Sequence, residues 1–280
     1  VPTNLYEATK NIDSLLSIIS VLEENSIGRR NEIILAVGGG ALLDIVSFAA
    51  SIYRRGIHVI KVPTSLLGIV DASVGIKTGI NYSGQRNRLG TYHFDYSVII
   101  DTKLLNGLSK AQLRQGLGEI FKIAVIKSKN LFNKLIKHTN ELEDVNFYNS
   151  VNGINIMTES IKLMIEELEN NPREENLERC VDFGHSFSPF VEMASINRKG
   201  TRILPHGYAV AYDCLLSTTI SKLRNIISNE DYEKIIKLYK NYDFDLSNEI
   251  YLDTNLMWSS FLELIKHRGG SQNFPVPTKI

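Results

Sequence analysis

The chain has 280 residues, with 31 Lys and Arg against 31 Asp and Glu, and a formal net charge of zero. This length suits one large or two ordinary domains, and the 43% hydrophobic content is ample for a buried core. The neutral balance gives no support for a nucleic-acid or anionic-membrane partner. Cys180 and Cys214 are too few for a disulfide framework, no apolar run reaches membrane-spanning length and no signal peptide is visible, so we expect a cytoplasmic protein.

The first part of the chain carries the signals of a parallel α/β layer. Residues 12–24 predict an amphipathic helix, and the apolar run 33–37 is typical of a strand buried on both faces of a parallel sheet. Gly38-Gly39-Gly40 follows, and then a helix over 41–53 and a strand over 58–62. Strand, glycine turn, helix and strand form a βαβ unit.

Residues 64–93 show little periodicity and predict a long polar loop, after which 97–100 predict a third strand. A loop of this length inside a compact domain is more often functional than idle. Its glycines allow backbone to lie against a ligand, and its Lys and Arg side chains suit a phosphate. The polar residues concerned are Asp71, Lys77, Thr78, Asn81, Arg86, Asn87, Arg88 and His93.

Beyond Asp101 the pattern changes to helices alone. We expect them at about 110–128, 130–138, 151–169, 174–195, 206–226, 229–241 and 255–267. The predicted fold class is therefore a parallel-sheet α/β domain followed by an all-α domain. We place the first domain at residues 1–104 and the second at 105–280.

One carboxylate and two imidazoles, Glu119, His185 and His206, come from three separate segments that we expect to be helical. Oxygen and nitrogen donors without thiolate suit zinc or a similar divalent ion, and three protein ligands leave a position for substrate. The spacing alone also fits ordinary solvated or core polar residues, because no two of the three lie within one helical turn.

Gly38-Gly39-Gly40 opens the helix that carries Asp44, so its backbone N–H groups could approach an anion at the helix N-terminus. A tight strand-to-helix turn explains the three glycines equally well, and the G-x-G-x-x-G fingerprint is absent. Arg54 and Arg55 add positive charge before Gly56, or simply form a charged helix end.

Several motifs together resemble the sugar phosphate cyclase superfamily, the dehydroquinate synthase group. They cover nearly the whole chain in the family's order, although the family's opening strands and helix have no counterpart before Val1. The motifs are Gly38-Gly39-Gly40-x-x-x-Asp44, Arg55-Gly56, Val62-Pro63-Thr64-Ser65-Leu66-Leu67, Asp71-Ala72-Ser73-Val74-Gly75-Ile76-Lys77-Thr78-Gly79, Gly118-Glu119-Ile120-Phe121-Lys122, Phe183-Gly184-His185 and His206-Gly207.

The resemblance implies an N-terminal domain that binds NAD and a C-terminal helical domain that holds one divalent metal, Zn or Co. It implies a sugar phosphate substrate and a homodimer in which Arg55 reaches the neighbouring subunit's substrate phosphate. The implied metal ligands are Glu119, His185 and His206. The implied NAD-binding residues are Gly38, Gly39, Gly40, Asp44, Thr64, Ser65, Asp71 and Lys77. The implied catalytic residues are Asp71, Lys77, Asn87, Lys122, Lys162 and Asp182, and the implied substrate or phosphate contacts are Arg55, Arg86, Asn87, Arg179, His267 and Arg268.

The departures from dehydroquinate synthases indicate a branch. Those enzymes carry Asn and a second His where this chain has Asp182 and Pro189, and an Arg where it has Glu178. A carboxylate at Asp182 would repel a carboxylated substrate but accept hydrogen bonds from a hydroxymethyl group. The chain is in these respects similar to 2-epi-5-epi-valiolone synthases, although Gly269 replaces their usual Asp.

The activity implied is conversion of sedoheptulose 7-phosphate by transient oxidation, β-elimination of phosphate, reduction, ring opening and intramolecular aldol closure. Dehydroquinate synthase and the synthases of deoxygadusol-type rings remain alternatives within the superfamily. A metal-dependent polyol dehydrogenase shares the two-domain plan, and a relative that binds nucleotide or sugar phosphate without turnover is the alternative outside catalysis.

Overall fold

The computed structural model of the chain describes residues 6–198, 203–267, 270 and 274–280. It divides into two compact units, Val1–Gly107 and Leu108–Ile280. The first is a mixed α/β unit and the second is helical, which confirms the predicted fold class. Among the described residues, no helix combines the length and the apolar character needed to cross a membrane.

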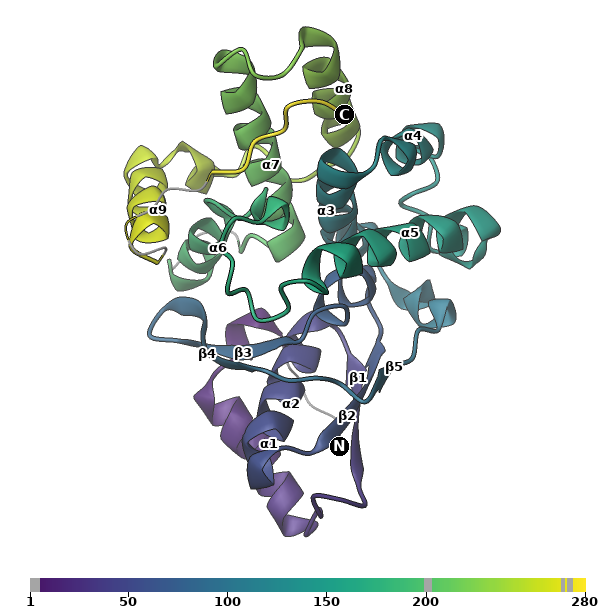
Figure 1. Cartoon of the computed structure of the whole chain (residues 1–280), viewed down its shortest axis with the longest axis vertical. Coiled ribbons are helices and arrows are strands. Elements are labelled where there is room, and N and C mark those ends of the chain that lie inside the picture. Colours follow the sequence, from purple (N-terminus) through teal and green to yellow (C-terminus); the bar gives the residue numbers. More distant parts are fainter. Residues whose placement is uncertain (1–5, 199–202, 268–269, 271–273) are drawn as a thin grey trace. The chain divides into compact units, whose positions relative to one another are not determined.

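The first unit is built on a parallel sheet with the strand order β1-β2-β5. The strands are β1 (Ile33–Gly38), β2 (His58–Pro63) and the two-residue β5 (Ser97–Val98), shorter than expected. Helix α2 (Gly40–Ile52) connects β1 to β2, and α1 (Ile12–Glu24) packs on α2, as Figure 1 shows. The β1 and β2 strands end side by side, with Gly38 paired to Pro63.

The apolar run of β1 predicts a strand buried on both faces, but the structure buries only one of its faces. Ala36 faces α2 and is buried with Leu43 and Val59, whereas Leu35 on the opposite face is 60% exposed. Ile33 and Val37 share that exposed face. A continuous apolar run shows that a strand belongs to a sheet, but it does not show how many layers cover the sheet.

The long polar segment is not a loop. It contains a short π-helical turn (Gly68–Ala72) and an antiparallel hairpin of β3 (Lys77–Tyr82) and β4 (Gln85–Tyr92). Ser83 and Gly84 both have positive φ, of 50° and 73°, as a two-residue hairpin turn requires. A register irregularity between Ile80 and Tyr82 and the many small residues hide the two-residue period from sequence reading.

The second unit consists of helices, most of which begin at a serine that caps them. Ser109, Ser128, Ser150 and Ser228 each accept a hydrogen bond from a backbone N–H in the first turn. The helices are α3 (Lys110–Lys127), α4 (Lys129–Lys137), α5 (Val151–Leu168), α6 (Ser188–Asn197), α7 (His206–Leu223), α8 (Asn229–Lys240) and α9 (Thr254–His267).

The helix predicted over 174–195 is wrong in its first half. Residues before Ser188 form irregular chain with one short 3₁₀ turn (Cys180–Asp182), and only α6 is helical. Gly184 has a φ of 80°, which breaks a right-handed helix at that point. Pro189 lies in the first turn of α6, where a missing N–H costs nothing, so the helix begins there.

Helices α3 and α7 cross at two glycines. A Cβ on Gly118 would lie 2.2 Å from the carbonyl oxygen of Gly207, and a Cβ on Gly207 would lie 2.0 Å from that of Gln115. The two backbones are therefore in direct contact, and a side chain at either position would separate them. Glu119 and His206, the neighbours of these glycines, are brought together by the same crossing.

We expect Gly118→Ala to lower the free energy of unfolding by about 1–3 kcal/mol, because the added methyl group overpacks the crossing. This loss would appear although alanine favours a helix by roughly 1 kcal/mol over glycine. Urea unfolding followed by circular dichroism measures it. Gly107→Ala is the control, since nothing lies within 4 Å of its Cβ position; equal or higher stability of Gly118→Ala would contradict the close crossing.

Candidate metal centre

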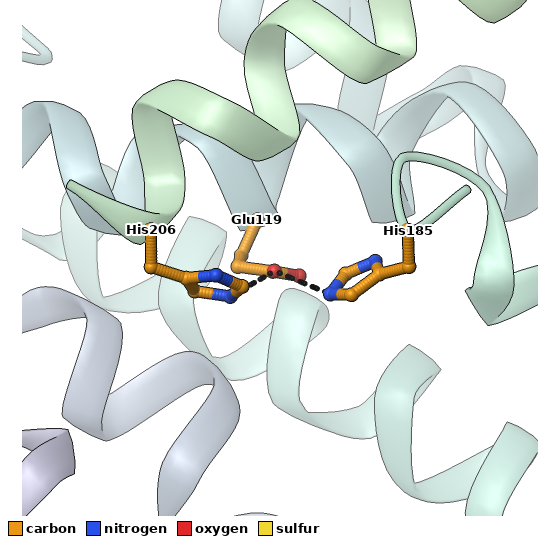
Figure 2. Close-up of side chains that lie close together, drawn as sticks. All are labelled: Glu119, His185 and His206. Atoms are coloured by element: carbon orange, nitrogen blue, oxygen red, sulfur yellow. Dashed lines mark hydrogen bonds and ion pairs between the residues drawn. The ribbon is translucent and has the colours of Figure 1, made fainter. Parts of the chain in front are cut away.

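Glu119, His185 and His206 meet in the second unit although 87 positions separate the first from the last. Glu119 lies in the middle of α3, His185 on the turn before α6, and His206 is the first residue of α7. One ligand atom from each lies within 4.8 Å of the others. Figure 2 shows the two imidazoles on either side of the carboxylate, with His206 Nε2 3.2 Å and His185 Nε2 3.6 Å from Glu119 Oε1.

The carboxylate of Glu119 is held in its charged form. It is 1% exposed, and Lys122, one turn along α3, places its Nζ 2.6 Å from Oε2. Burial alone would raise the pKa of Glu119, but the Lys122 cation and the imidazoles of His206 and His185 outweigh it and hold the pKa well below its ordinary value. A buried charged oxygen is thus ready to bind a cation.

Both imidazoles are oriented through their Nδ1 atoms. His185 Nδ1 lies 3.4 Å from the carbonyl oxygen of Phe183, and His206 Nδ1 lies 3.1 Å from Glu192 Oε2. The carbonyl oxygen of Phe183 can only accept, so His185 donates from Nδ1 and keeps its Nε2 lone pair toward Glu119. His206 has a carboxylate oxygen near each of its ring nitrogens.

The arrangement fits a divalent cation. Two ligand atoms each about 2.1 Å from a tetrahedral zinc ion lie roughly 3.4 Å apart, close to the 3.2 and 3.6 Å from Glu119 Oε1 to the two Nε2 atoms. With Nδ1 protonated, Nε2 and Oε1 are both acceptors that face each other, so a cation between them removes the repulsion. One carboxylate and two imidazoles without sulfur suit zinc or a similar metal.

His185 is held by a turn rather than by the helix that its sequence predicts. Its backbone N–H donates to the carbonyl oxygen of Asp182, and Gly184 leaves no room for a side chain, since a Cβ there would lie 2.6 Å from Cys214 Sγ. Asp213 of α7 accepts the N–H groups of Phe187 and Ser188 at 2.6 and 2.9 Å. The start of α6 is thereby fixed to α7.

Other residues predicted for the substrate lie in the same unit. Asp182 is buried and accepts from Arg179 Nη2 at 2.6 Å, and Arg179 also pairs with Glu174. Lys162 is exposed on α5. The backbone of His267 ends α9, while its side chain and the whole of Arg268 lie outside the described residues.

In the first unit, five of the residues predicted for NAD lie at or just after the carboxyl ends of β1 and β2: Gly38, Gly39, Gly40, Thr64 and Ser65. The N–H of Thr64 donates to the carbonyl oxygen of Gly38 at 2.9 Å, and a Cβ on Gly39 would lie 3.5 Å from Ser65 Oγ. Gly39 caps α2 without a side-chain hydrogen bond, and the first N–H groups of a helix suit a phosphate. This edge is where ligands bind in open parallel sheets.

Asp44 lies farther into α2 and pairs with Lys10 at 2.8 Å. Lys10 is only 1% exposed and also lies 3.6 Å from Glu7, which in turn accepts from Asn81. Sequence reasoning missed Lys10 and Glu7, because a Lys and a Glu before a helix look like surface charges. Two more of the predicted residues are half-buried, Asp71 in the π-helical turn and Arg86 in β4. Lys77 at the start of β3, Arg55 and Asn87 are exposed.

Glu192 is the missed residue of the metal cluster. It is the one charged residue in the stretch Phe190-Val191-Glu192-Met193-Ala194. A lone carboxylate among apolar residues is a sign of a buried, paired group, so the signal was present in the sequence.

An α/β unit followed by a helical unit with a Glu-His-His cluster defines a two-unit protein with a candidate metal centre. The family model of the 3-dehydroquinate synthase N-terminal domain matches residues 2–115, and that of the C-terminal domain matches residues 116–267. The chain belongs to the dehydroquinate synthase family.

Among its relatives, a 2-epi-5-epi-valiolone synthase from Actinomyces sp is 37% identical over 279 residues, covering 98% of this chain and 72% of the relative. A demethyl-4-deoxygadusol synthase from Trichormus variabilis is 33% identical over 288 residues, covering 100% and 68%. The solved structure of ValA (2-epi-5-epi-valiolone synthase) from Streptomyces hygroscopicus subsp. jinggangensis 5008, with NAD+ and Zn2+ bound, has a TM-score of 0.93 and 34% identity, covering 99% and 75%.

Asp213 makes the stability of the protein depend on pH. Burial raises its pKa from 3.8 to about 6, although the N–H groups of Phe187 and Ser188 and the hydroxyl of Ser217 favour the charged form. Because the folded pKa exceeds the unfolded one, the folded protein binds the proton more tightly. The contribution to stability is complete below about pH 4 and is lost as the pH rises through about 6.

We therefore expect Asp213→Asn, which mimics the protonated carboxyl group, to match the wild type near pH 4 and to be more stable at pH 7 by up to about 3 kcal/mol. Urea unfolding of the metal-free proteins across this range measures the difference. A difference that stays constant with pH would contradict the raised pKa.

Proposed function

We propose that the chain is an NAD- and metal-dependent sugar phosphate cyclase, a phosphate-eliminating lyase that converts sedoheptulose 7-phosphate to 2-epi-5-epi-valiolone. The observation that carries the proposal is the convergence of Glu119, His185 and His206 on one point. It is supported by the relatives named 2-epi-5-epi-valiolone synthase and by ValA, whose structure holds NAD+ and Zn2+. We further propose a cytoplasmic homodimer in which Arg55 serves the partner's site.

Zinc or cobalt on Glu119, His185 and His206 would supply Lewis acidity toward the substrate oxygens, and NAD would supply a reversible hydride acceptor. The chain's own part is positioning and charge. Lys122 lies against Glu119 in a buried setting, where a fixed ammonium group acts more strongly than in water. The glycines at the start of α2 admit a phosphate group of the cofactor to the helix N-terminus.

Asp182 supports the valiolone branch of the family. Its carboxylate is buried and is held by Arg179, so it keeps one orientation. A fixed carboxylate next to the metal-binding turn disfavours a carboxylated substrate by charge repulsion and accepts a hydrogen bond from a hydroxymethyl group. The backbone hydrogen bond from His185 N–H to the carbonyl oxygen of Asp182 holds this carboxylate-bearing residue next to a metal ligand.

Product analysis tests the proposal. The protein, loaded with zinc or cobalt and NAD, is incubated with sedoheptulose 7-phosphate, and the expected result is 2-epi-5-epi-valiolone and inorganic phosphate without net NADH. We expect His206→Ala to lose zinc and turnover together, while His58→Ala, an exposed histidine of β2, keeps both. Net formation of NADH from a polyol would identify a dehydrogenase instead. A different carbocyclic product would identify another branch of the family. Full zinc occupancy in His206→Ala would refute the proposed ligands.

Asp182→Asn tests the assignment of the branch. Because it replaces a charged acceptor by a neutral one, we expect kcat/KM for sedoheptulose 7-phosphate to fall about 10–100-fold with zinc binding unchanged. Steady-state kinetics with phosphate release as the readout measures the effect. Glu175→Gln, an exposed carboxylate of the same segment, is the matched control; an unchanged kcat/KM in Asp182→Asn would remove the argument for this branch.

A further inference from the structure

Glu192 is a buried carboxylate that faces the metal centre from a helix that supplies none of the three ligands. Its side chain is 2% exposed, and Oε2 lies 3.1 Å from His206 Nδ1. The opposite ring nitrogen of His206, Nε2, lies 3.2 Å from Glu119 Oε1. The imidazole is therefore held between two carboxylates, one from α6 and one from α3.

The two carboxylates cannot play the same part. A neutral imidazole carries one proton, so it can donate to only one of them. We propose that Glu192 positions the metal ligand His206. It accepts a hydrogen bond from Nδ1–H of His206, which fixes the orientation and the tautomer of the ring and leaves Nε2 to bind the cation together with Glu119. The inference rests on the proposed metal site and extends it to a residue outside the ligand set.

Helix α6 is built to hold His206 at two points. Ser195, almost one turn after Glu192, donates to the carbonyl oxygen of Glu192 at 2.7 Å and accepts the N–H of Leu204 at 2.9 Å. The same helix thus binds the backbone two residues before His206 and the ring of His206 itself. Both Glu192 and Ser195 are buried, so water does not compete for these contacts.

The support is mutual between the two helices. While α6 orients the imidazole of α7 through Glu192, α7 fixes the start of α6 through Asp213, which accepts from Phe187 and Ser188. His185 lies in the turn that leads into α6. A shift of α6 would therefore move the orienting carboxylate and the second imidazole at the same time, so both histidine ligands depend on the α6–α7 contact.

A purely structural role for Glu192 makes a different prediction. A carboxylate that only stabilises the fold would, when removed, lower the unfolding free energy and leave the metal affinity of the folded protein unchanged. A positioning carboxylate changes the affinity and the tautomer even where the fold survives. Loss of such a partner to a metal-binding histidine typically lowers metal affinity about 10–100-fold.

The test measures zinc affinity by competition with a chromogenic chelator in the full chain, for the wild type, Glu192→Gln and Glu192→Ala. Glu233→Gln, an exposed glutamate of α8, is the matched control. We expect zinc binding about 10–100-fold weaker in Glu192→Gln, weaker still in Glu192→Ala, and unchanged in Glu233→Gln. The shape of glutamine keeps the first variant folded if the alanine variant is not.

The tautomer of His206 gives a readout independent of activity. Long-range ¹H–¹⁵N correlation spectra of the zinc-loaded wild type should show a proton on Nδ1 of His206, and Glu192→Ala should show this proton lost or exchanging with water. Wild-type affinity together with the wild-type tautomer in both Glu192 variants would overturn the positioning role alone. Absence of zinc binding in the wild type would overturn the proposed metal site as well.

Discussion

The helical unit depends on one buried negative charge, that of Glu119. A carboxylate removed from water is costly unless opposite charge and hydrogen-bond donors surround it. Lys122 supplies the opposite charge from the same helix, and the two imidazoles face the carboxylate from a turn and from the first residue of another helix, where a bound cation would complete the compensation. The meeting is possible because Gly118 and Gly207 allow α3 and α7 to cross in backbone contact. The same glycines that shape the fold therefore determine whether a cation can be bound.

The carboxylates around this centre have distinct tasks that follow from what each one touches. Glu119 faces both Nε2 atoms, and Glu192 faces the Nδ1 atom of His206. Among the described residues, Asp213 accepts hydrogen bonds from backbone N–H groups and from a hydroxyl group. Asp182, paired with Arg179, borders the turn of His185 and is suited to meet the substrate. In the proposed function, different side chains of this one unit therefore bind the metal ion, orient a histidine ligand and select the substrate. The proposal places the nucleotide at the glycine turn of the first unit, where β1 and β2 end side by side.

Much of this could be predicted from the sequence, and the exceptions have physical causes. The helix over 12–24 and the strands near 33–38 and 58–63 follow from local periodicity and lie where expected. The helix over 174–195 was wrong because the positive φ of Gly184 and the capping by Asp213, 25 or more residues away, override local propensity. The hairpin of β3 and β4 was missed because its small residues and its irregular register remove the period of two. Glu119, His185 and His206 were named from motifs, but their convergence and the role of Glu192 depend on helix packing that no local pattern contains.

The central claim is that one divalent ion is shared by a glutamate and two histidines through their Nε2 atoms. X-ray diffraction from zinc-soaked crystals, recorded on both sides of the zinc absorption edge, tests it most directly. The account predicts one strong anomalous peak about 2.0–2.2 Å from a carboxylate oxygen of Glu119 and from Nε2 of His185 and of His206. A peak at another position, or coordination through Nδ1 of either histidine, would contradict it.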